Sequence, residues 1–261
     1  MHVRIFQVDA FTTRRFAGNP AAVMPLEHFP ADATLQAIAA ENNLAETAFL
    51  VPDGDDYQLR WFTPTTEVPL CGHATLASAA VVMERLEPGR GGVVFHSASG
   101  PLAVSRAGPG YVMDFPARPS SPVPTPPALS AALGTALHEV YLNSFNYLAV
   151  LDDAAVLREL APDMPALAKL DRDGVIVTAP GDGDYDFFSR YFAPAKGIPE
   201  DPVTGSAHCM LAPYWAKRLG KTEFRAFQAS QRGGELVCRL AADRIALEGT
   251  CVFYLEGEVA I

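Results

Sequence analysis

Short hydrophobic stretches rich in β-branched and aromatic residues recur between turn residues along the chain, and they predict β-strands. The first half has such stretches at residues 3–11, 21–26, 47–52, 57–64, 92–99, 101–107 and 111–117. The second half has them at 138–145, 147–151, 174–180, 185–194, 235–240, 244–249 and 251–261. An amphipathic helical period appears at 31–43, and shorter helices are expected near 153–160 and 163–169.

Two further helical stretches have almost no polar side. Residues 73–83 are nearly all small or apolar, and so is the first half of 206–219, before Lys217 and Arg218 mark its end. A helix that is apolar all round is buried all round. We therefore expect each of these helices to lie at the centre of a curved sheet.

The two halves of the chain resemble each other around these helices. The segments "PDGDDYQLRWFTPTTEVPLCGHATLASA" (52–79) and "PGDGDYDFFSRYFAPAKGIPEDPVTGSAHCML" (180–211) share a turn, a strand, an aromatic-x-Pro step, a glycine and an apolar helix. This repeat predicts an α+β fold with two similar lobes related by pseudo-twofold symmetry. Each lobe is a curved β-sheet or barrel wrapped around a central apolar helix.

A proline-rich stretch divides the repeats. The segment "FPARPSSPVPTPPALS" (115–130) has six prolines in sixteen residues, a composition that disfavours a central strand or a helix. The predicted division is an N-terminal lobe at 1–116, a linker at 117–128 and a C-terminal lobe at 129–261.

The composition narrows the class of protein. The chain has 261 residues and a formal charge of −10, with no basic run, which argues against nucleic-acid binding. It has no stretch of about 18 apolar residues, so no membrane span is expected. The N-terminus has no signal-peptide pattern, and the four cysteines have no framework spacing. These features predict a cytoplasmic protein with reduced thiols.

Both apolar helices begin at a glycine that follows a strand and a loop. The first N–H groups of a helix have no internal partner and carry a positive dipole, so starts at Gly72 and Gly205 can bind a carboxylate or an oxyanion. The alternative is that both are ordinary turn glycines.

Ionisable residues accompany the two glycines. His73 follows Gly72, Asp201 precedes Gly205 by four positions, and Glu46 lies at the entrance of an apolar strand. A carboxylate desolvated at such an entrance suits general acid–base chemistry. The repeat places Gly174 opposite Glu46, so this carboxylate is specific to the first half. A solvated loop residue or a helix cap is the alternative for Glu46.

Metal and thiol chemistry are the other readings of this region. Cys71 and His73, with His208 and Cys209, do not have the spacing of common zinc sites, so we expect no metal. Cys71 alone could act as a nucleophile or a proton carrier at a helix N-terminus. We expect His208 and Cys209 to pack on the second central helix.

Five segments together resemble the PhzF-like family of phenazine biosynthesis. They are "VDAFTTRRFAGNPAAV", "NNLAETAFL", "RWFTPTTEVPLCGHATLASA", "EDPVTGSAHCMLAPYWAKRLGK" and "QASQRGGELVCRL", in order from residue 8 to residue 240. The resemblance implies the diaminopimelate epimerase fold, with the active site between two lobes, and a homodimer.

The resemblance also implies an activity and a set of residues. It implies isomerisation of a small carboxylic acid, such as trans-2,3-dihydro-3-hydroxyanthranilate, without metal or cofactor, in which a glutamate moves a proton between carbons. The site would comprise Glu46, His73 and Asp201 for catalysis, and Asn19, Gly72, Gly205 and Ser206 for substrate binding.

Two other functions remain open at this level. Related epimerases use two cysteines, and Cys71 matches the position of one of them. The second half has no cysteine at the matching position, which disfavours a two-cysteine racemase. A non-catalytic binding or scaffolding module is the other alternative, although it gives no reason for Glu46, His73 and Asp201 to occur together.

Overall fold

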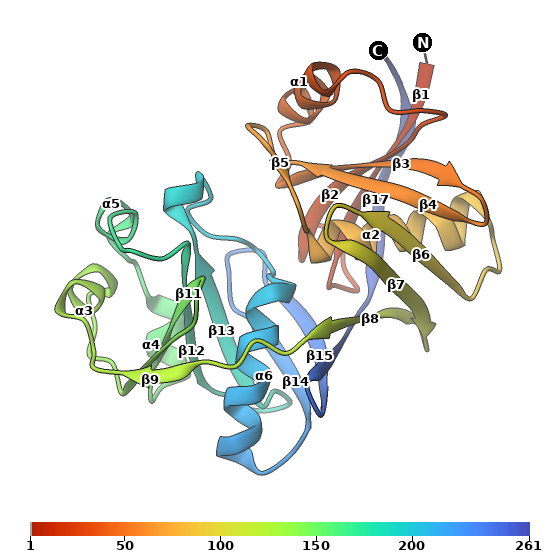
Figure 1. The fold of residues 1–261 in the computed structure, drawn as a ribbon. Coiled ribbons are helices and arrows are strands. Elements are labelled where there is room, and N and C mark those ends of the chain that lie inside the picture. The colour runs from red at the N-terminus through yellow and green to blue at the C-terminus, as the bar shows by residue number, and fades with distance from the viewer. Residues whose placement is uncertain (1) are drawn as a thin grey trace. The chain divides into compact units, whose positions relative to one another are not determined.

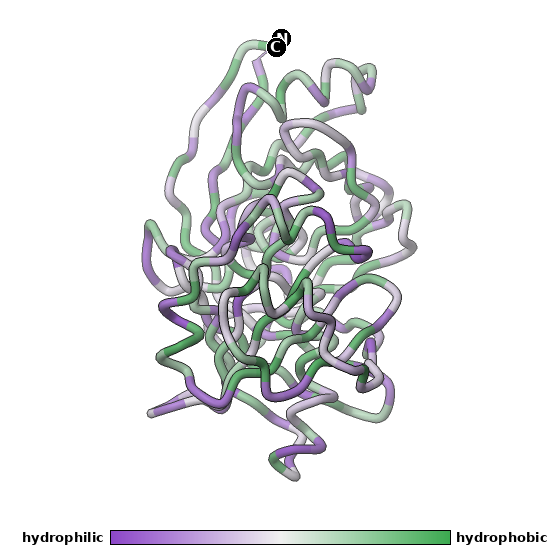
Figure 2. Tube along the Cα trace, turned by 90° about the vertical axis from the view of Figure 1, so that its left-hand side faces the viewer, coloured by the Kyte–Doolittle hydropathy of each residue, from purple (hydrophilic) through white to green (hydrophobic). Residues whose placement is uncertain are grey.

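The computed structural model describes residues 2–261, which separate into two compact units. The first unit comprises the residues up to Asp114 together with Glu248–Ile261, and the second comprises Phe115–Leu247. Both units mix strands and helices (Figure 1). Hydrophobic and hydrophilic residues alternate along much of the chain (Figure 2), as half-buried strands require.

The first unit is built from a continuous series of paired strands. They are β1 (His2–Ala10), β2 (Asn19–Pro25), β3 (Glu46–Asp53), β4 (Asp56–Phe62), β5 (Glu67–Val68), β6 (Gly92–Ser97), β7 (Gly100–Ala107), β8 (Gly110–Pro116) and β17 (Cys251–Ala260). Strand β1 pairs antiparallel with β17 and β2, and β2 pairs parallel with β3. Strand β4 is antiparallel to β3 and β5 and parallel to β6, and β7 is antiparallel to β6 and β8.

Helices cover both faces of this sheet. Helix α1 (Asp32–Asn42) buries Leu35 against Phe49 and Phe62 on one face. Helix α2 (Gly72–Val81) contacts β1, β2, β3 and β17 and continues as a π-helical turn, η1 (Val82–Leu86). Figure 1 shows α1 and α2 on opposite sides of β3. Residues 46–50 are therefore buried without alternation, as in strands with both faces covered.

The strands of the second unit are β9 (Ser121–Val123), β10 (Glu139–Leu142), β11 (Asn146–Val150), β12 (Gly174–Pro180), β13 (Phe187–Phe192), β14 (Glu223–Gln228), β15 (Gly234–Ala241) and β16 (Arg244–Gly249). Strand β10 is antiparallel to β9 and β11, and β11 is parallel to β12. Strand β13 is antiparallel to β12 and parallel to β14, which is antiparallel to β15.

Helices also cover both faces of the second sheet. One face packs against α3 (Pro127–Leu133), α4 (Ala154–Glu159) and α5 (Met164–Leu167). The other face packs against α6 (Gly205–Leu219), where the Trp215 ring stacks on Phe187 at 5.5 Å. Pro213 lies inside α6 and cannot donate to the carbonyl of Cys209. The amide of Arg118, in the proline-rich segment, donates to that carbonyl at 2.9 Å and ties the segment to the helix.

The two units repeat one pairing scheme in one register. Strands β2, β3, β4, β6 and β7 pair in the same senses as β11, β12, β13, β14 and β15. Thr47 pairs with Phe62 in the first unit, as Val175 pairs with Phe192 in the second. The predicted correspondence of Phe62 with Phe192 therefore agrees with the strand register.

The structure corrects the predicted ends of the lobes. The C-terminal lobe was expected to extend over 129–261, but β17 pairs with β1 from Cys251 opposite Ala10 to Ala260 opposite His2. The last strand therefore belongs to the first unit. The expected linker at 117–128 contains β9 and the first two residues of α3. Pro127 suits the first position of the helix, because its missing N–H would have no helical partner there.

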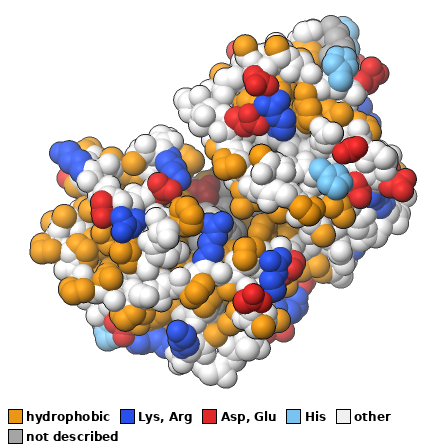
Figure 3. Space-filling view, viewed as in Figure 1, with side chains coloured by type: hydrophobic (Ala, Val, Ile, Leu, Met, Phe, Trp, Pro, Cys, Tyr) orange, Lys and Arg blue, Asp and Glu red, His pale blue; other side chains and the backbone are white. Residues whose placement is uncertain are grey.

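The surface agrees with the charge pattern of the sequence. Lys and Arg side chains are dispersed over the face shown in Figure 3, several of them next to acidic ones. Arg60 pairs with Asp32 and Glu67, and Lys221 pairs with Asp186. Between residues 2 and 261, no helix is long and apolar enough to cross a bilayer.

Candidate active site

Glu46 lies buried at the first position of β3. Its register partner on the parallel strand β2 is Ala21, and the residue is 8% exposed. Its Oε2 atom lies 3.2 Å from Nε2 of His73, which is 4% exposed. Within the described chain neither atom has a further hydrogen-bond partner. The predicted carboxylate is therefore neither solvated nor a helix cap, because it faces a buried imidazole.

Two other side chains contact the opposite nitrogen of the ring. Nδ1 of His73 lies 3.1 Å from Nδ2 of Asn19 and 3.5 Å from Sγ of Cys71. An asparagine amide can present its N–H to a neutral ring, or its oxygen to a charged ring after a half-turn. Asn19 can therefore support His73 in both protonation states.

Electrostatics favour the charged form of His73. Burial opposes charge on the ring, but Cys71 and Glu46 beside it raise the pKa of His73 well above its usual value. Burial raises the pKa of the Cys71 thiol to about 11. Near neutral pH this thiol is therefore uncharged.

The backbone at the start of α2 lies next to His73 and adds free N–H groups to the site. Cys71 is extended with φ −143° and ψ 111°, and its side chain does not cap the helix. The first N–H groups of α2 follow directly, beside the buried pair. Further along, Thr75 and Ser78 donate their hydroxyls to the carbonyls of Cys71 and Ala74, which explains how polar residues fit an otherwise apolar helix.

The second unit places its predicted residues at the start of α6. Asp201 accepts a 2.5 Å hydrogen bond from the hydroxyl of Thr204, the residue before Gly205. A Cβ added at Gly205 would touch only Leu247, at 3.4 Å, so packing within the chain does not require a glycine there. That observation fits a position where a ligand approaches the backbone. Ser206 is exposed in the first turn of the helix.

The donor atoms around His73 could also hold a metal ion. Glu46, Cys71 and His73 each offer one ligand atom within 4.8 Å of the others, the only such group within residues 2–261. However, the ring faces Cys71 with Nδ1 and Glu46 with Nε2. An ion bound to Nδ1 beside the thiol would leave Glu46 as the partner of the other nitrogen. The arrangement therefore gives two direct protein ligands from this group, fewer than a usual zinc site.

His208 has the packing role predicted for it. It is fully buried, its Nδ1 donates to the carbonyl of Thr204 at 2.8 Å, and its ring stacks on Phe187. Burial lowers its pKa to about 4, so it is neutral near pH 7. Cys209 is also buried on α6.

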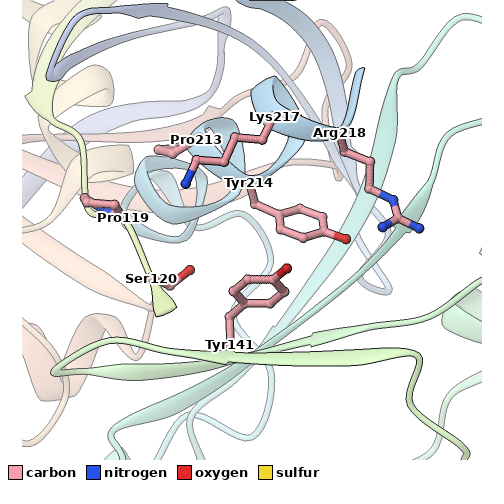
Figure 4. Close-up of a pocket in the computed structure, with 7 residues that line it drawn as sticks. All are labelled: Pro119, Ser120, Tyr141, Pro213, Tyr214, Lys217 and Arg218. Carbon is pink, nitrogen blue, oxygen red and sulfur yellow. The ribbon is translucent and has the colours of Figure 1, made fainter. Parts of the chain in front are cut away.

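A surface cavity of about 180 Å³ in the second unit lies away from these residues. Figure 4 shows Tyr141 and Tyr214 facing each other there, with Lys217 and Arg218 beside them. Arg218 is paired with Glu139, and the lining contains no residue predicted for the site. The cavity therefore adds nothing to the candidate site.

The structure thus brings the predicted residues together in two groups. Asn19, Glu46, Gly72 and His73 meet in the first unit, and Asp201, Gly205 and Ser206 meet in the second. The sequence did not predict the contacts of Gln228 with the Asp201 loop. The "QASQRGG" segment could have indicated these contacts, but it was used only for the family resemblance, and none of its residues was assigned a role.

Comparison with known proteins gives one consistent picture. The model of the family described as phenazine biosynthesis-like protein, PhzC-PhzF, matches residues 8–257. A protein of Pseudomonas aeruginosa named an uncharacterized isomerase is 50% identical, over 98% of each chain. The crystal structure of a PhzF-family phenazine biosynthesis protein from Enterococcus faecalis superposes with a TM-score of 0.97, at 46% identity and full coverage of both chains.

A more distant structure shares the fold alone. The structure of a probable proline racemase from Agrobacterium radiobacter superposes with a TM-score of 0.64, at 11% identity, over 99% of this chain and 93% of the other. The mixed α/β fold is therefore shared by PhzF-family and proline racemase structures.

Proposed function

The chain belongs to the PhzC/PhzF phenazine biosynthesis-like family and is an isomerase of that family, and on this premise we propose that Glu46 moves a proton between two carbons of a small carboxylic acid. The observation that carries the proposal is the contact of 3.2 Å between the buried Glu46 carboxylate and His73. A carbon acid requires a base held close to it, with water excluded. The burial of Glu46 supports the second requirement.

The proton and the electrons balance within the substrate. Glu46 takes a proton as the carbon–hydrogen bond breaks, and the electron pair moves into the adjacent unsaturated system. Glu46 then returns the proton to a second carbon, so no oxidant or reductant is consumed. His73 faces Glu46 through Nε2 and keeps the carboxyl in place through both protonation states, with Asn19 behind the ring.

The remaining predicted residues bind and orient the substrate in this proposal. Backbone N–H groups at Gly72 and Gly205 stabilise the carboxylate or the developing oxyanion, as helix N-termini do. Asp201 assists proton transfer, and Ser206 contributes to substrate binding. The PhzF resemblance suggests trans-2,3-dihydro-3-hydroxyanthranilate as the first substrate to test.

The decisive experiment is a proton NMR assay in D₂O with this acid, comparing wild type with Glu46→Gln. The amide keeps the size of the side chain but cannot carry the proton. We expect turnover to fall by about a thousandfold or more. Glu41→Gln is the matched control, because Glu41 is an exposed glutamate on α1 and should keep full activity.

The outcomes distinguish an error in the proposed base from an error in the proposed substrate. Retained turnover in a folded Glu46→Gln variant contradicts the proposal. If wild type does not act on this acid, other small carboxylic acids are screened for solvent deuterium exchange. Exchange that depends on Glu46 supports the mechanism with a different substrate, and exchange that persists in Glu46→Gln contradicts it.

The proposal includes a homodimer and requires no metal or cofactor. Light scattering coupled to gel filtration measures the first, and unchanged turnover after dialysis against a chelator tests the second. A racemase that uses Cys71 is disfavoured, because the buried thiol is protonated near neutral pH. The register also places Thr204, and no cysteine, at the matching position of the second unit.

A further inference from the structure

The "QASQRGG" segment begins at the last residue of β14 and contacts the loop that carries Asp201. Gln228 is fully buried, and its Nε2 donates to the backbone carbonyl of Asp201 at 2.8 Å. Its Oε1 accepts from the backbone N–H of Thr204 at 2.8 Å. Ser230 donates to the carbonyl of Pro202 at 2.8 Å. Two side chains of one segment therefore bond to the backbone of Asp201, Pro202 and Thr204.

The hydrogen bonds of Gln228 have a fixed direction. Because Oε1 faces an N–H donor, Nε2 must face the acceptors, which are the Asp201 carbonyl and the Thr204 hydroxyl at 3.1 Å. The opposite amide orientation would set donor against donor and acceptor against acceptor. The hydroxyl of Thr204, which accepts from Gln228, directs its own proton to Oδ2 of Asp201. The chain of donors therefore ends at the carboxylate.

The first unit contains the same arrangement without this chain of donors. The strand registers align Ser97 with Gln228 and Ser99 with Ser230. Ser99 donates to the carbonyl of Pro69 at 2.8 Å, which repeats the bond from Ser230 to Pro202. Ser97 donates to Gly100 in its own turn instead. The serine contact is thus the shared structural element of both repeats.

The Gln228 contacts occur only in the repeat that carries Asp201. Cys71 occupies the position that matches Thr204, and its thiol faces His73. A purely structural role would be needed at both helix starts, and the serine contact already supplies it at both. The additional contacts therefore serve the carboxylate.

We propose that Gln228 and Thr204 are positioning residues for Asp201, acting as a directed relay that holds its carboxylate in the charged form and in one orientation. This inference rests on the proposed function, because it assigns a purpose to the Asp201 carboxylate. A donor to a carboxylate stabilises its charged form, and a misplaced catalytic group loses rate.

The test uses the full-length protein with four substitutions. Thr204→Val removes the hydroxyl at constant size, Thr204→Ser restores it, Gln228→Leu removes the relay, and Ser230→Ala removes only the shared contact. We expect kcat for trans-2,3-dihydro-3-hydroxyanthranilate to fall by about 10- to 100-fold in Thr204→Val and Gln228→Leu, with KM nearly unchanged. The acidic limb of the kcat profile should move to higher pH. Thr204→Ser should recover most of the rate, and Ser230→Ala should keep it.

The double variant adds a check on the pathway. If both residues act through one relay, Thr204→Val combined with Gln228→Leu should lose no more than the larger single effect. Losses that multiply, or a Ser230→Ala variant as slow as Thr204→Val, would overturn the relay. If Gln228→Leu does not fold, the Thr204 pair still decides the outcome.

A second readout separates this inference from the proposed function. Carbon NMR of protein labelled at aspartate carboxyls, with the Asp201 signal assigned by its loss in Asp201→Asn, follows the carboxyl without any substrate. We expect its titration midpoint to rise by about one pH unit in Thr204→Val and to stay unchanged in Ser230→Ala. An unchanged midpoint in Thr204→Val overturns the relay even if wild type is active. If wild type is inactive on the acid, the proposed substrate fails while this titration still decides the relay.

Discussion

The two repeats begin their central helices in the same way but surround them with different chemistry. In the first repeat, Cys71 precedes α2 and His73 lies one residue inside it, in contact with Glu46. In the second, Thr204 precedes α6, and its hydroxyl and amide are bonded to Asp201 and Gln228. One scaffold thus presents a buried carboxylate beside an imidazole in the first repeat, and a carboxylate bonded to a hydroxyl in the second.

At the position that matches Glu46, the second repeat has no room for a side chain. The register places Gly174 there, opposite Asn146 on the parallel strand. A Cβ at Gly174 would lie 2.4 Å from the hydroxyl of Tyr191, so the phenol occupies the space of a longer side chain. That hydroxyl donates to Asn146 at 3.1 Å. The glycine is therefore a steric requirement, and the second repeat has no carboxylate at the position of Glu46.

The two buried histidines allow the sharpest test of this difference. His73→Asn removes the nitrogen that faces Glu46, so we expect turnover to fall by about 10²- to 10⁴-fold. The same substitution at His208 keeps an amide near the Nδ1 position, where it can still donate to Thr204, and activity should stay within about threefold. Steady-state rates of both variants, normalised to folded protein, measure this. Equal losses would mean that His73 acts only in packing.

A smaller effect is expected in the pH dependence of stability. His208 has a pKa of about 4 when folded and 6.5 when unfolded, so the unfolded chain binds the extra proton between these values. The free energy of unfolding should therefore be highest above pH 6.5 and fall by roughly 3 kcal/mol as the pH drops to 4. Urea unfolding across this range measures it. His208→Asn should reduce the slope, and an unchanged slope would assign the loss to other groups.

Local pattern was sufficient for most of the strands and helices. Glu46 was predicted from an acidic residue entering an apolar strand, and the contact with His73 confirms its burial. The strand β14 was missed, although its charged, exposed Glu223 and Arg225 alternate with the buried Phe224 and Ala226. Its last residue, Gln228, was missed with it, and so were its contacts with Thr204.

Long-range pairing could not be predicted from local pattern. β17 was predicted as a strand, but nothing in its sequence states that its partner is β1, about 250 positions earlier. The lobe boundary at 129–261 failed for that reason. The contacts of Gln228 with the Asp201 loop are also long-range. They depend on the parallel pairing of β13 with β14, in which Ser189 lies opposite Gln228.

The smallest expected effect concerns Cys71, the residue in the first repeat that a racemase mechanism would use. Its thiol is buried, has a pKa of about 11 and lies 3.5 Å from Nδ1 of His73. Cys71→Ser replaces the thiol with a smaller hydroxyl that can either donate a hydrogen bond to the ring or accept one from it, so we expect activity within about fivefold of wild type. A loss of about a thousandfold, roughly 4 kcal/mol of barrier, would instead assign the proton to the thiol. In that case Cys71 and Glu46 would both be acid–base groups of the first repeat. The difference between Cys71 and Thr204 would then define the chemistry, in place of the difference between Glu46 and Gly174.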